Sequence, residues 1–502
     1  PSPPATSTDV MPAPDESSST SPRPWSTPSS ESGPESGPES GPFVEVAGYG
    51  RRSDGRGPIW LWVAAALSVT AACGLGLMGD MAAQIPLMWV ACGICLIGYG
   101  LGAWRVWQSG ASVRLILGCA LLMRLALLPS EPSLSDDIYR YLWDGRVQWD
   151  GLNPYAHAPD SEPVAHLRDG LWERINHPHV PTDYPPLAQW LFAGVVGLGG
   201  GVTALKLALL LCEVGTIAAI MSLLRQRGRD PAWVLLYAWH PLPLLEIAGS
   251  GHIDALGVAA LMMSLVWLGQ SHRKRAAAGL AAAILAKLIP VVCAIAFWRA
   301  WQGNGRWAWL DPVSRAPLVL TGALVGGAFW LYLLDGTDIF HGLQTYALKW
   351  QFNDGVFGLV YYLLRDPELA WDDAALLLAR QICLVLWVAV LVWTLRWRDP
   401  ARICFALLGA YVVLSPTVHP WYLLWILPFL PLFPRLAWLV WGGLVLLSYE
   451  VLIGFRSAGV WAPAPWAIWA QYGPFFAALG VDIWRRRHQM DASTERVAAS
   501  DV

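Results

Sequence analysis

Residues 113–146 read VRLILGCALLMRLALLPSEPSLSDDIYRYLWDGR, an apolar run that is soon followed by two adjacent carboxylates, Asp136 and Asp137. A helix that crosses a bilayer needs about 20 mostly apolar residues. Such runs recur from Ile59 to Trp484, in a chain of 502 residues of which 55% are hydrophobic and 14% charged. This composition is not that of a water-soluble globule. It predicts an all-α polytopic membrane protein, whose carboxylate pair stands where the chain leaves the membrane.

The two ends of the chain differ from this apolar middle. The stretch ESGPESGPESGP at 31–42 repeats Glu, Ser, Gly and Pro, which bury too little apolar area to fold. We therefore expect residues 1–56 to be a disordered cytoplasmic tail, 57–486 a membrane domain, and 487–502 a cytoplasmic C-terminal tail. The eight cysteines all lie in apolar runs without metal-type clustering, so we expect neither a disulfide framework nor a zinc site.

The charges between the apolar runs predict the topology. Basic segments at 225–230, 271–275, 396–402 and 484–488 all fall on one side if the N-terminus is cytoplasmic. The basic loop 299–315 joins them only if span 276–298 enters the membrane and returns, with a break near Lys287 and Pro290. We expect about 12 crossings and one re-entrant hairpin, or about 14 membrane helices by a looser count. The candidate spans are 59–79, 86–104, 111–129, 202–224, 231–248, 254–270, 276–298, 316–334, 374–396, 401–416, 420–433, 436–453 and 466–484.

This assignment places residues 130–186 and 335–373 outside the cytoplasm, as a first and a second periplasmic loop. The first loop begins with SDDIYRYLWDGRVQW at 135–149, which is typical of an amphipathic helix at the membrane surface, with Tyr139, Trp143 and Trp149 as anchors.

The carboxylates at the start of this helix have two interpretations. In the structural one, Ser135 caps the helix, both carboxylates complement its dipole, and Asp136 pairs with Arg140 four residues on. In the functional one, a carboxylate held at a cavity mouth has a raised pKa and accepts a proton from a hydroxyl. The residues alone leave both open.

The same loop continues with two segments that are rich in Pro, His and Tyr, NPYAHAP (153–159) and INHPHVPTDYPPLAQW (175–190). Their prolines predict an ordered, non-helical backbone, and a rigid loop beside a cavity is where sites are commonly built. His177 or His179 is a candidate site residue, although such a segment is also suited to be a rigid lid alone.

Three further motifs place ionisable groups in or beside spans, where they are costly and indicate function by default. The stretch 239–265 carries Glu246, His252 and Asp254, either as a site or as a pair that satisfies itself. Lys287 lies inside an apolar run and needs an anionic partner, either a carboxylate or a phosphate. The stretch SPTVHPWYLLWILP at 415–428 places His419 on the outer side, as an interface anchor or as a contact to a lipid phosphate.

Together, these motifs resemble those of the bacterial integral-membrane glycosyltransferases of the GT-C superfold, in particular the mannosyltransferase-like glycosyltransferase family 87. The resemblance covers about 115–435 and rests on five motifs in order, SDDIYRYLWDGR, NPYAHAP, INHPHVPTDYPPLAQ, WHPLPLLEIAGSGHIDAL and SPTVHPWYLLWILP. It implies a GT-C-like bundle and a polyprenyl-phosphate hexose donor, with mannose as the sugar by analogy. It also implies a catalytic carboxylate in the first periplasmic loop, which here is Asp136 or Asp137, with a slight preference for Asp136.

The implied reaction is inverting transfer of the hexose to an acceptor hydroxyl of a cell-envelope lipid or glycan at the outer face of the bacterial inner membrane. One Asp serves as the base, and phosphate is already a good leaving group. We expect no cofactor and assign no metal, since the adjacent Asp-Asp is not the D-x-D of nucleotide-sugar enzymes. The candidate substrate-binding residues are Tyr139, Arg140, His177, Tyr184, Glu246, His252, Asp254, Lys287, His419 and Tyr422.

Two alternatives were weighed against glycosyl transfer. A nucleotide-sugar transferase needs a nucleotide-binding domain, and the chain has no soluble α/β stretch that could form one. A transporter or flippase for a lipid-linked sugar suits the many spans, but transporters commonly carry internal repeats and midplane sites. Here the polar motifs crowd one face.

Overall fold

The computed structural model describes residues 57–302, 312–334, 336–369 and 371–500. The expected N-terminal tail, 1–56, lies outside these residues. The described chain is helical, and the one β pairing within it is an isolated bridge between Phe352 and Thr417. The all-α prediction is therefore confirmed.

Six helices in the described chain are long and apolar enough to cross a membrane, and they confirm a multi-pass membrane protein. The helices of the first half are α1 (Gly57–Leu77), α2 (Ile85–Ser109), α3 (Val113–Leu127), α4 (Asp137–Trp149), α5 (Pro186–Gly197), α6 (Val202–Gln226), α7 (Leu235–Ala238), α8 (Pro241–Pro243), α9 (Asp254–Gly269) and α10 (Arg273–Ala286). Those of the second half are α11 (Ala294–Trp301), α12 (Pro312–Leu333), α13 (His341–Lys349), α14 (Gly355–Leu364), α15 (Asp373–Thr394), α16 (Pro400–Leu414), α17 (Leu436–Leu444), α18 (Val451–Ala458) and α19 (Pro465–Ser500).

Short helical turns join these elements where the backbone is irregular. They include the 3-10 turns η1 (Met81–Gln84), η2 (Glu162–Leu167), η3 (Trp172–Arg174), η4 (Pro231–Val234), η6 (Ile289–Cys293), η8 (Pro420–Trp425), η9 (Leu427–Phe429) and η10 (Val445–Glu450), and a π-helical turn, η5 (Leu244–Gly249). Two predicted spans are irregular: 231–248 is divided among η4, the very short helices α7 and α8, and η5, and 420–433 contains η8 and η9. Irregular backbone at membrane depth is tolerated only where protein or a cavity surrounds it.

The predicted break in segment 276–298 is present. Helix α10 ends before Lys287, whose backbone is extended (φ −158°, ψ 140°), and η6 and α11 continue the chain. At the end of this stretch, the Arg299 side chain donates to the Leu395 carbonyl, close to Asp399, which pairs with Arg227 just after α6. Helix α10 starts directly after the turn at the end of α9. The segment therefore returns to the basic end of the bundle from which it came.

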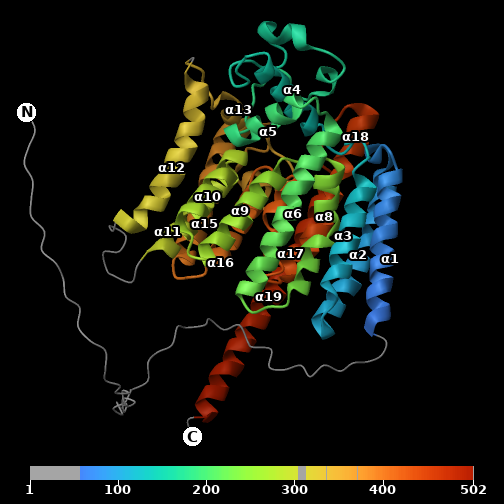
Figure 1. Ribbon diagram of the computed structural model, residues 1–502, viewed down its shortest axis with the longest axis vertical. Helices are drawn as coiled ribbons and strands as arrows, with labels where there is room; N and C mark the ends of the chain where they lie inside the picture. Colours follow the sequence, from blue (N-terminus) through green and yellow to red (C-terminus); the bar gives the residue numbers. More distant parts are fainter. Residues whose placement is uncertain (1–56, 303–311, 335, 370, 501–502) are drawn as a thin grey trace, which may run out of the picture. The chain divides into compact units, whose positions relative to one another are not determined.

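Helix α4 is amphipathic as predicted, but its expected membrane anchors are wrong in two of three cases. Tyr139 and Trp143 are 4% and 0% exposed, and only Trp149, at 63%, stays outside. The reason is close packing of α4 on α5, because a Cβ on Gly145 would lie 2.6 Å from the Phe192 carbonyl oxygen. Helices α4, α5 and α13 lie at the same end of the bundle (Figure 1).

Buried charges hold the helix that leads into the carboxylate loop. Arg124 of α3 forms an ion pair with Glu213 of α6 (2.7 Å), and both side chains are almost fully buried. Lys206 of α6, also buried, donates to the Ser130 carbonyl (2.7 Å) just beyond α3. These contacts fix the end of α3 relative to α6, six residues before Asp136. A buried pair of this kind costs desolvation, so we read it as a device that sets position more than one that adds stability.

Candidate active site

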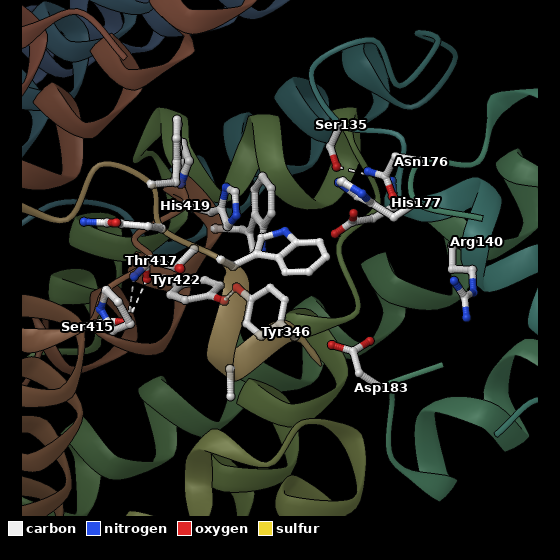
Figure 2. Close-up of a pocket in the computed structure, with 18 of the residues that line it drawn as sticks. Ser135, Arg140, Asn176, His177, Asp183, Tyr346, Ser415, Thr417, His419 and Tyr422 are labelled. Carbon is white, nitrogen blue, oxygen red and sulfur yellow. Dashed lines mark hydrogen bonds between the residues drawn. The ribbon is translucent and has the colours of Figure 1, made fainter. Parts of the chain in front are cut away.

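A cavity of about 1750 Å³ opens at the α4 end of the bundle, and its lining includes Lys287 and residues of the motifs at 135–149, 175–190 and 415–428. Figure 2 shows Arg140, Asn176, His177 and Asp183 on one side and Ser415, Thr417, His419 and Tyr422 on the other, with Tyr346 between them. Nine of the twelve predicted site residues line this cavity, namely Asp136, Asp137, Tyr139, Arg140, His177, Tyr184, Lys287, His419 and Tyr422.

The two carboxylates at the start of α4 have different surroundings. Asp136 Oδ1 accepts a hydrogen bond from Asn176 Nδ2 (2.5 Å), and burial together with the charge of Asp137 raises the pKa of Asp136 to about 7. Asp137 Oδ2 lies 3.6 Å from His252 Nδ1, and its side chain is 22% exposed. Asp136 takes the N-cap position of α4, but its side chain makes no capping hydrogen bond. The helix-cap interpretation therefore does not account for this carboxylate.

The expected pairing of Asp136 with Arg140 is wrong. Arg140 Nε donates to Asp144 Oδ1 (2.8 Å), one turn further along α4, and its Nη1 donates to the Val180 carbonyl (2.9 Å). Asp136 and Asp144 each lie four residues from Arg140, so both are within reach of its side chain. Asp144 is buried, and a buried carboxylate needs a counter-charge.

Lys287 has the anionic partner that its position demanded, and this partner is a carboxylate. Its Nζ contacts both oxygens of Asp254 (2.9 and 2.8 Å), and Trp425 Nε1 also donates to Asp254 (2.6 Å). The Lys287 side chain remains 18% exposed and lines the cavity, while the Asp254 side chain is fully buried. The Lys287 ammonium also lies 5.1 Å from the centre of the Tyr422 ring.

Glu246, His252 and Asp254 do not line the cavity, so the prediction that they contact substrate directly is corrected. They are buried next to residues that line the cavity. The hydroxyl of Tyr449, a lining residue, donates to Glu246 (2.8 Å), and Glu246 lies 3.2 Å from His252 Nε2. Neither nitrogen of His252 has a partner in hydrogen-bond geometry, although its ring stacks on Trp421 at 4.0 Å. The bend that brings His252 towards Asp137 needs Gly251, whose φ is +77°.

The ring of His419 lies in a stack of aromatic rings that includes Trp421, the ring on which His252 also stacks. Its ring is parallel to that of Trp421 (centroids 4.3 Å apart) and lies 4.9 Å from Phe352. Burial, with smaller contributions from Lys287 and His252, lowers the pKa of His419 to about 3. His419 is therefore a neutral hydrogen-bonding group at physiological pH.

The second loop closes over the cavity. Phe352 bonds through its backbone to Pro416 and Val418 (3.0 and 2.8 Å), and the hydroxyl of Tyr346 contacts that of Tyr422. On the other side, a Cβ on Gly342 would lie 2.4 Å from the Pro181 carbonyl oxygen, so α13 packs tightly on the Pro-rich segment. The second loop thus joins the two walls of the cavity.

The predicted residues His177 and Tyr184 have less direct positions. His177 has a left-handed backbone (φ +45°) and its ring lies against Trp350 (4.7 Å), so it contributes to the closure of the cavity. Tyr184 packs against Tyr141 (4.9 Å). Tyr139 lies under the guanidinium of Arg174 at 4.1 Å.

Part of the cavity lining is apolar and comes from neighbouring elements, η6, α15 and α16; we call this part the apolar arm. The helix α15 presents one face to it, with residues spaced by three and four positions. Its basic end is Arg380, whose Nη2 donates to the Leu348 carbonyl (2.8 Å), while its buried Nε has no partner among the described residues. The residues lining this arm are Leu288, Ile289, Val291, Val292, Cys383, Leu384, Trp387, Tyr411 and Leu414.

Sequence reasoning missed Asn176, Asp183 and Tyr346, although all three line the cavity. Asn176 and Asp183 lie in the Pro-rich segment 175–190, in which only the histidines His177 and His179 were predicted as candidates. A carboxylate between prolines, in a loop expected to be rigid, is a signal that was available. Tyr346 lies in a loop without any motif, and only the fold brings it to Tyr422.

Comparison with known proteins gives this arrangement a context. Residues 57–303 match the family described as Alpha-(1->6)-mannopyranosyltransferase, N-terminal domain. The resemblance to membrane mannosyltransferases is confirmed. The matched part contains α4, the Pro-rich segment and Lys287, all of which contribute to the lining of the cavity. No solved structure matches the chain.

Curated relatives extend the similarity beyond residue 303. Alpha-(1->6)-mannopyranosyltransferase A of Mycobacterium tuberculosis is 26% identical over 394 residues, covering 68% of this chain and 69% of the relative. A probable alpha-(1->6)-mannopyranosyltransferase of Mycolicibacterium smegmatis is 25% identical over 420 residues (71% and 69%). Alpha-(1->6)-mannopyranosyltransferase A of Corynebacterium glutamicum is 25% identical over 194 residues and covers 38% of each chain.

Proposed function

We propose that this protein is a membrane mannosyltransferase that transfers mannose from a polyprenyl-phosphate donor to a hydroxyl of a cell-envelope lipid or glycan, with inversion at the anomeric carbon. The names of its relatives support a mannosyltransferase. The observation that carries the rest is the cavity, whose lining combines polar groups, among them Asp136 and Asp137, with the apolar arm from α15, α16 and η6.

In this proposal the apolar arm holds the polyprenyl chain, and the phosphate lies at its upper end. Lys287 and Arg380 are basic residues of the same cavity lining. Arg380 has a buried Nε without a partner among the described residues, and a guanidinium suits phosphate recognition. The ammonium of Lys287 is shared with Asp254, so it serves as a hydrogen-bond donor to phosphate more than as a free charge.

Asp136 is then the base. One of its oxygens is engaged by Asn176, and a pKa of about 7 is well matched to a group that takes a proton near neutral pH. It accepts the proton of the acceptor hydroxyl while that oxygen bonds to the anomeric carbon. The bond between this carbon and the phosphate oxygen breaks, and the lipid phosphate leaves with the electron pair. Asp137, held towards His252, orients the base.

Transfer from purified protein is the direct test. The full chain is incubated with an envelope lipid extract and either radiolabelled polyprenyl-phosphate mannose or a nucleotide-diphosphate mannose. We expect labelled product from the lipid donor only. Transfer from the nucleotide sugar alone would contradict the donor assignment. In proteoliposomes, movement of the lipid donor between leaflets without product formation would favour the transporter alternative.

The proposed site faces the outside of the cytoplasmic membrane, and this gives a labelling prediction. Glu162 is exposed in the first loop, and Lys274 is exposed at the basic end of α10. Cysteine at Glu162 should react with a membrane-impermeant thiol reagent in whole cells with the outer barrier opened, because the loop lies outside. Cysteine at Lys274 should react only after lysis, each measured above the parent chain. The reverse pattern would invert the topology.

A further inference from the structure

The Pro-rich segment presents one carboxylate that the proposed reaction does not use. Asp183 lines the cavity opposite His419 and Tyr422, and its carboxylate has no side-chain partner among the described residues, since its hydrogen bond is to its own backbone (Figure 2). Prolines 181, 185 and 186 flank it, so the local backbone has few alternatives.

A buried polar network fixes the backbone on both sides of Asp183. Thr182 Oγ1 accepts from Gln189 Nε2 (2.9 Å), and the Tyr184 carbonyl accepts from the Tyr155 hydroxyl (2.7 Å). Gln189 also donates to Asp144 (3.0 Å), the partner of Arg140. The neighbours of Asp183 are thus all engaged, while its own carboxylate is left to the cavity.

The fold gives the Asp183 carboxylate no stabilising role, because no other side chain among the described residues bonds to it. A buried or half-buried carboxylate without a partner is costly, and burial raises the pKa of Asp183 to about 6 against the opposing effect of Arg140 and Lys287. Rigid, unpartnered polar groups of this kind cluster where a ligand supplies the missing partner.

A complementary donor lies on the same wall. Arg140 is 9% exposed and lines the cavity, and its Nη2 is buried without a partner among the described residues, although Nε and Nη1 are engaged. Figure 2 shows Arg140 and Asp183 on the same side of the cavity. A carboxylate repels phosphate, whereas a fixed acceptor beside a fixed donor suits neighbouring sugar hydroxyls, each of which donates and accepts.

We propose that Asp183 is a sugar-binding residue, which accepts a hydrogen bond from a hydroxyl of the mannose being transferred and so orients its anomeric carbon towards Asp136. This inference rests on the proposed function and adds to it a specificity determinant that lies outside the catalytic pair. Lys287 and Asp183 both line the cavity, so in this proposal the sugar lies beside the phosphate of the same donor.

Deoxy donors provide the test. Polyprenyl-phosphate mannose and its 2-, 3-, 4- and 6-deoxy analogues are assayed for kcat/KM with the wild-type chain, Asp183→Ala and Asp183→Asn. A hydrogen bond to an ionised group contributes enough that Asp183→Ala should lose about 10- to 100-fold with the parent donor. The wild type should lose a similar factor with one deoxy donor, and with that donor the wild type and Asp183→Ala should agree within about twofold.

Asp160→Asn is the matched control, because Asp160 is an exposed carboxylate of the same loop that does not line the cavity, and its activity should equal that of the wild type. Asp183→Asn keeps the shape and should retain part of the activity, which separates loss of binding from misfolding. Equal loss of Asp183→Ala with the parent and all four deoxy donors would overturn the inference while leaving the proposed function intact. Absence of transfer by the wild type would overturn both.

Discussion

Asp136→Asn is expected to lower sugar transfer by about 10²- to 10⁴-fold while the protein inserts and binds donor almost normally. The amide keeps the shape of the side chain, and its oxygen still accepts the hydrogen bond from Asn176. It cannot take up a proton near neutral pH, so the acceptor hydroxyl stays a weak nucleophile. Single-turnover transfer and donor binding, measured on the same preparation, separate the two effects.

The pH dependence supplies a second readout of the same residue. Only ionised Asp136 accepts a proton, and its pKa of about 7 means that kcat/KM should fall as the pH drops below about 7. The negative charge of Asp137 contributes to this raised pKa. Asp137→Asn should therefore move the acid limb to lower pH, while transfer remains measurable. Wild-type rates in both Asn variants would remove the base from the mechanism.

The apolar runs predicted all six described helices that are long and apolar enough to cross a membrane, because membrane insertion depends on length and hydropathy, which are local properties. The other seven predicted spans are not among these six helices. The break at Lys287 was also predictable, since a lone ammonium in an apolar run and a nearby proline both disfavour a continuous span. The region 231–248 was predicted as one helix but is a series of short turns. Its hydropathy was correct, but the bends follow from tertiary packing around the cavity, which hydropathy does not report.

The site shows the same division. The motifs identified nine residues that line the cavity. This succeeded because ionisable groups in or beside a membrane are costly and are usually kept for a function. Partner choice was not predictable in the same way. Arg140 has Asp136 four residues before it and Asp144 four residues after it. Asp144 is the buried one, and it is held by Gln189, which lies 45 residues further along the chain. The sequence does not show this contact. The position of Asp183 between prolines was visible in the sequence, but only the folded chain shows that its carboxylate has no side-chain partner among the described residues and faces the cavity.

Lys287→Met alone is expected to lower the thermal stability of the protein strongly, and not only its affinity for the donor. The substitution leaves the carboxylate of Asp254 fully buried, with Trp425 as its remaining donor among the described residues. Breaking a buried ion pair in this way costs about 3–5 kcal/mol. We expect a lower Tm in detergent and a smaller monodisperse fraction than for the wild type.

The double variant Lys287→Met/Asp254→Asn separates the structural role of Lys287 from its proposed role in donor binding. Asparagine at 254 keeps an acceptor for Trp425 Nε1 and removes the unpaired charge, so most of the stability should return. Donor affinity should remain about tenfold below that of the wild type, because the hydrogen-bond donor near the phosphate is still missing. A double variant that is stable and binds donor normally would make Lys287 a purely structural partner of Asp254 and would leave Arg380 to hold the phosphate.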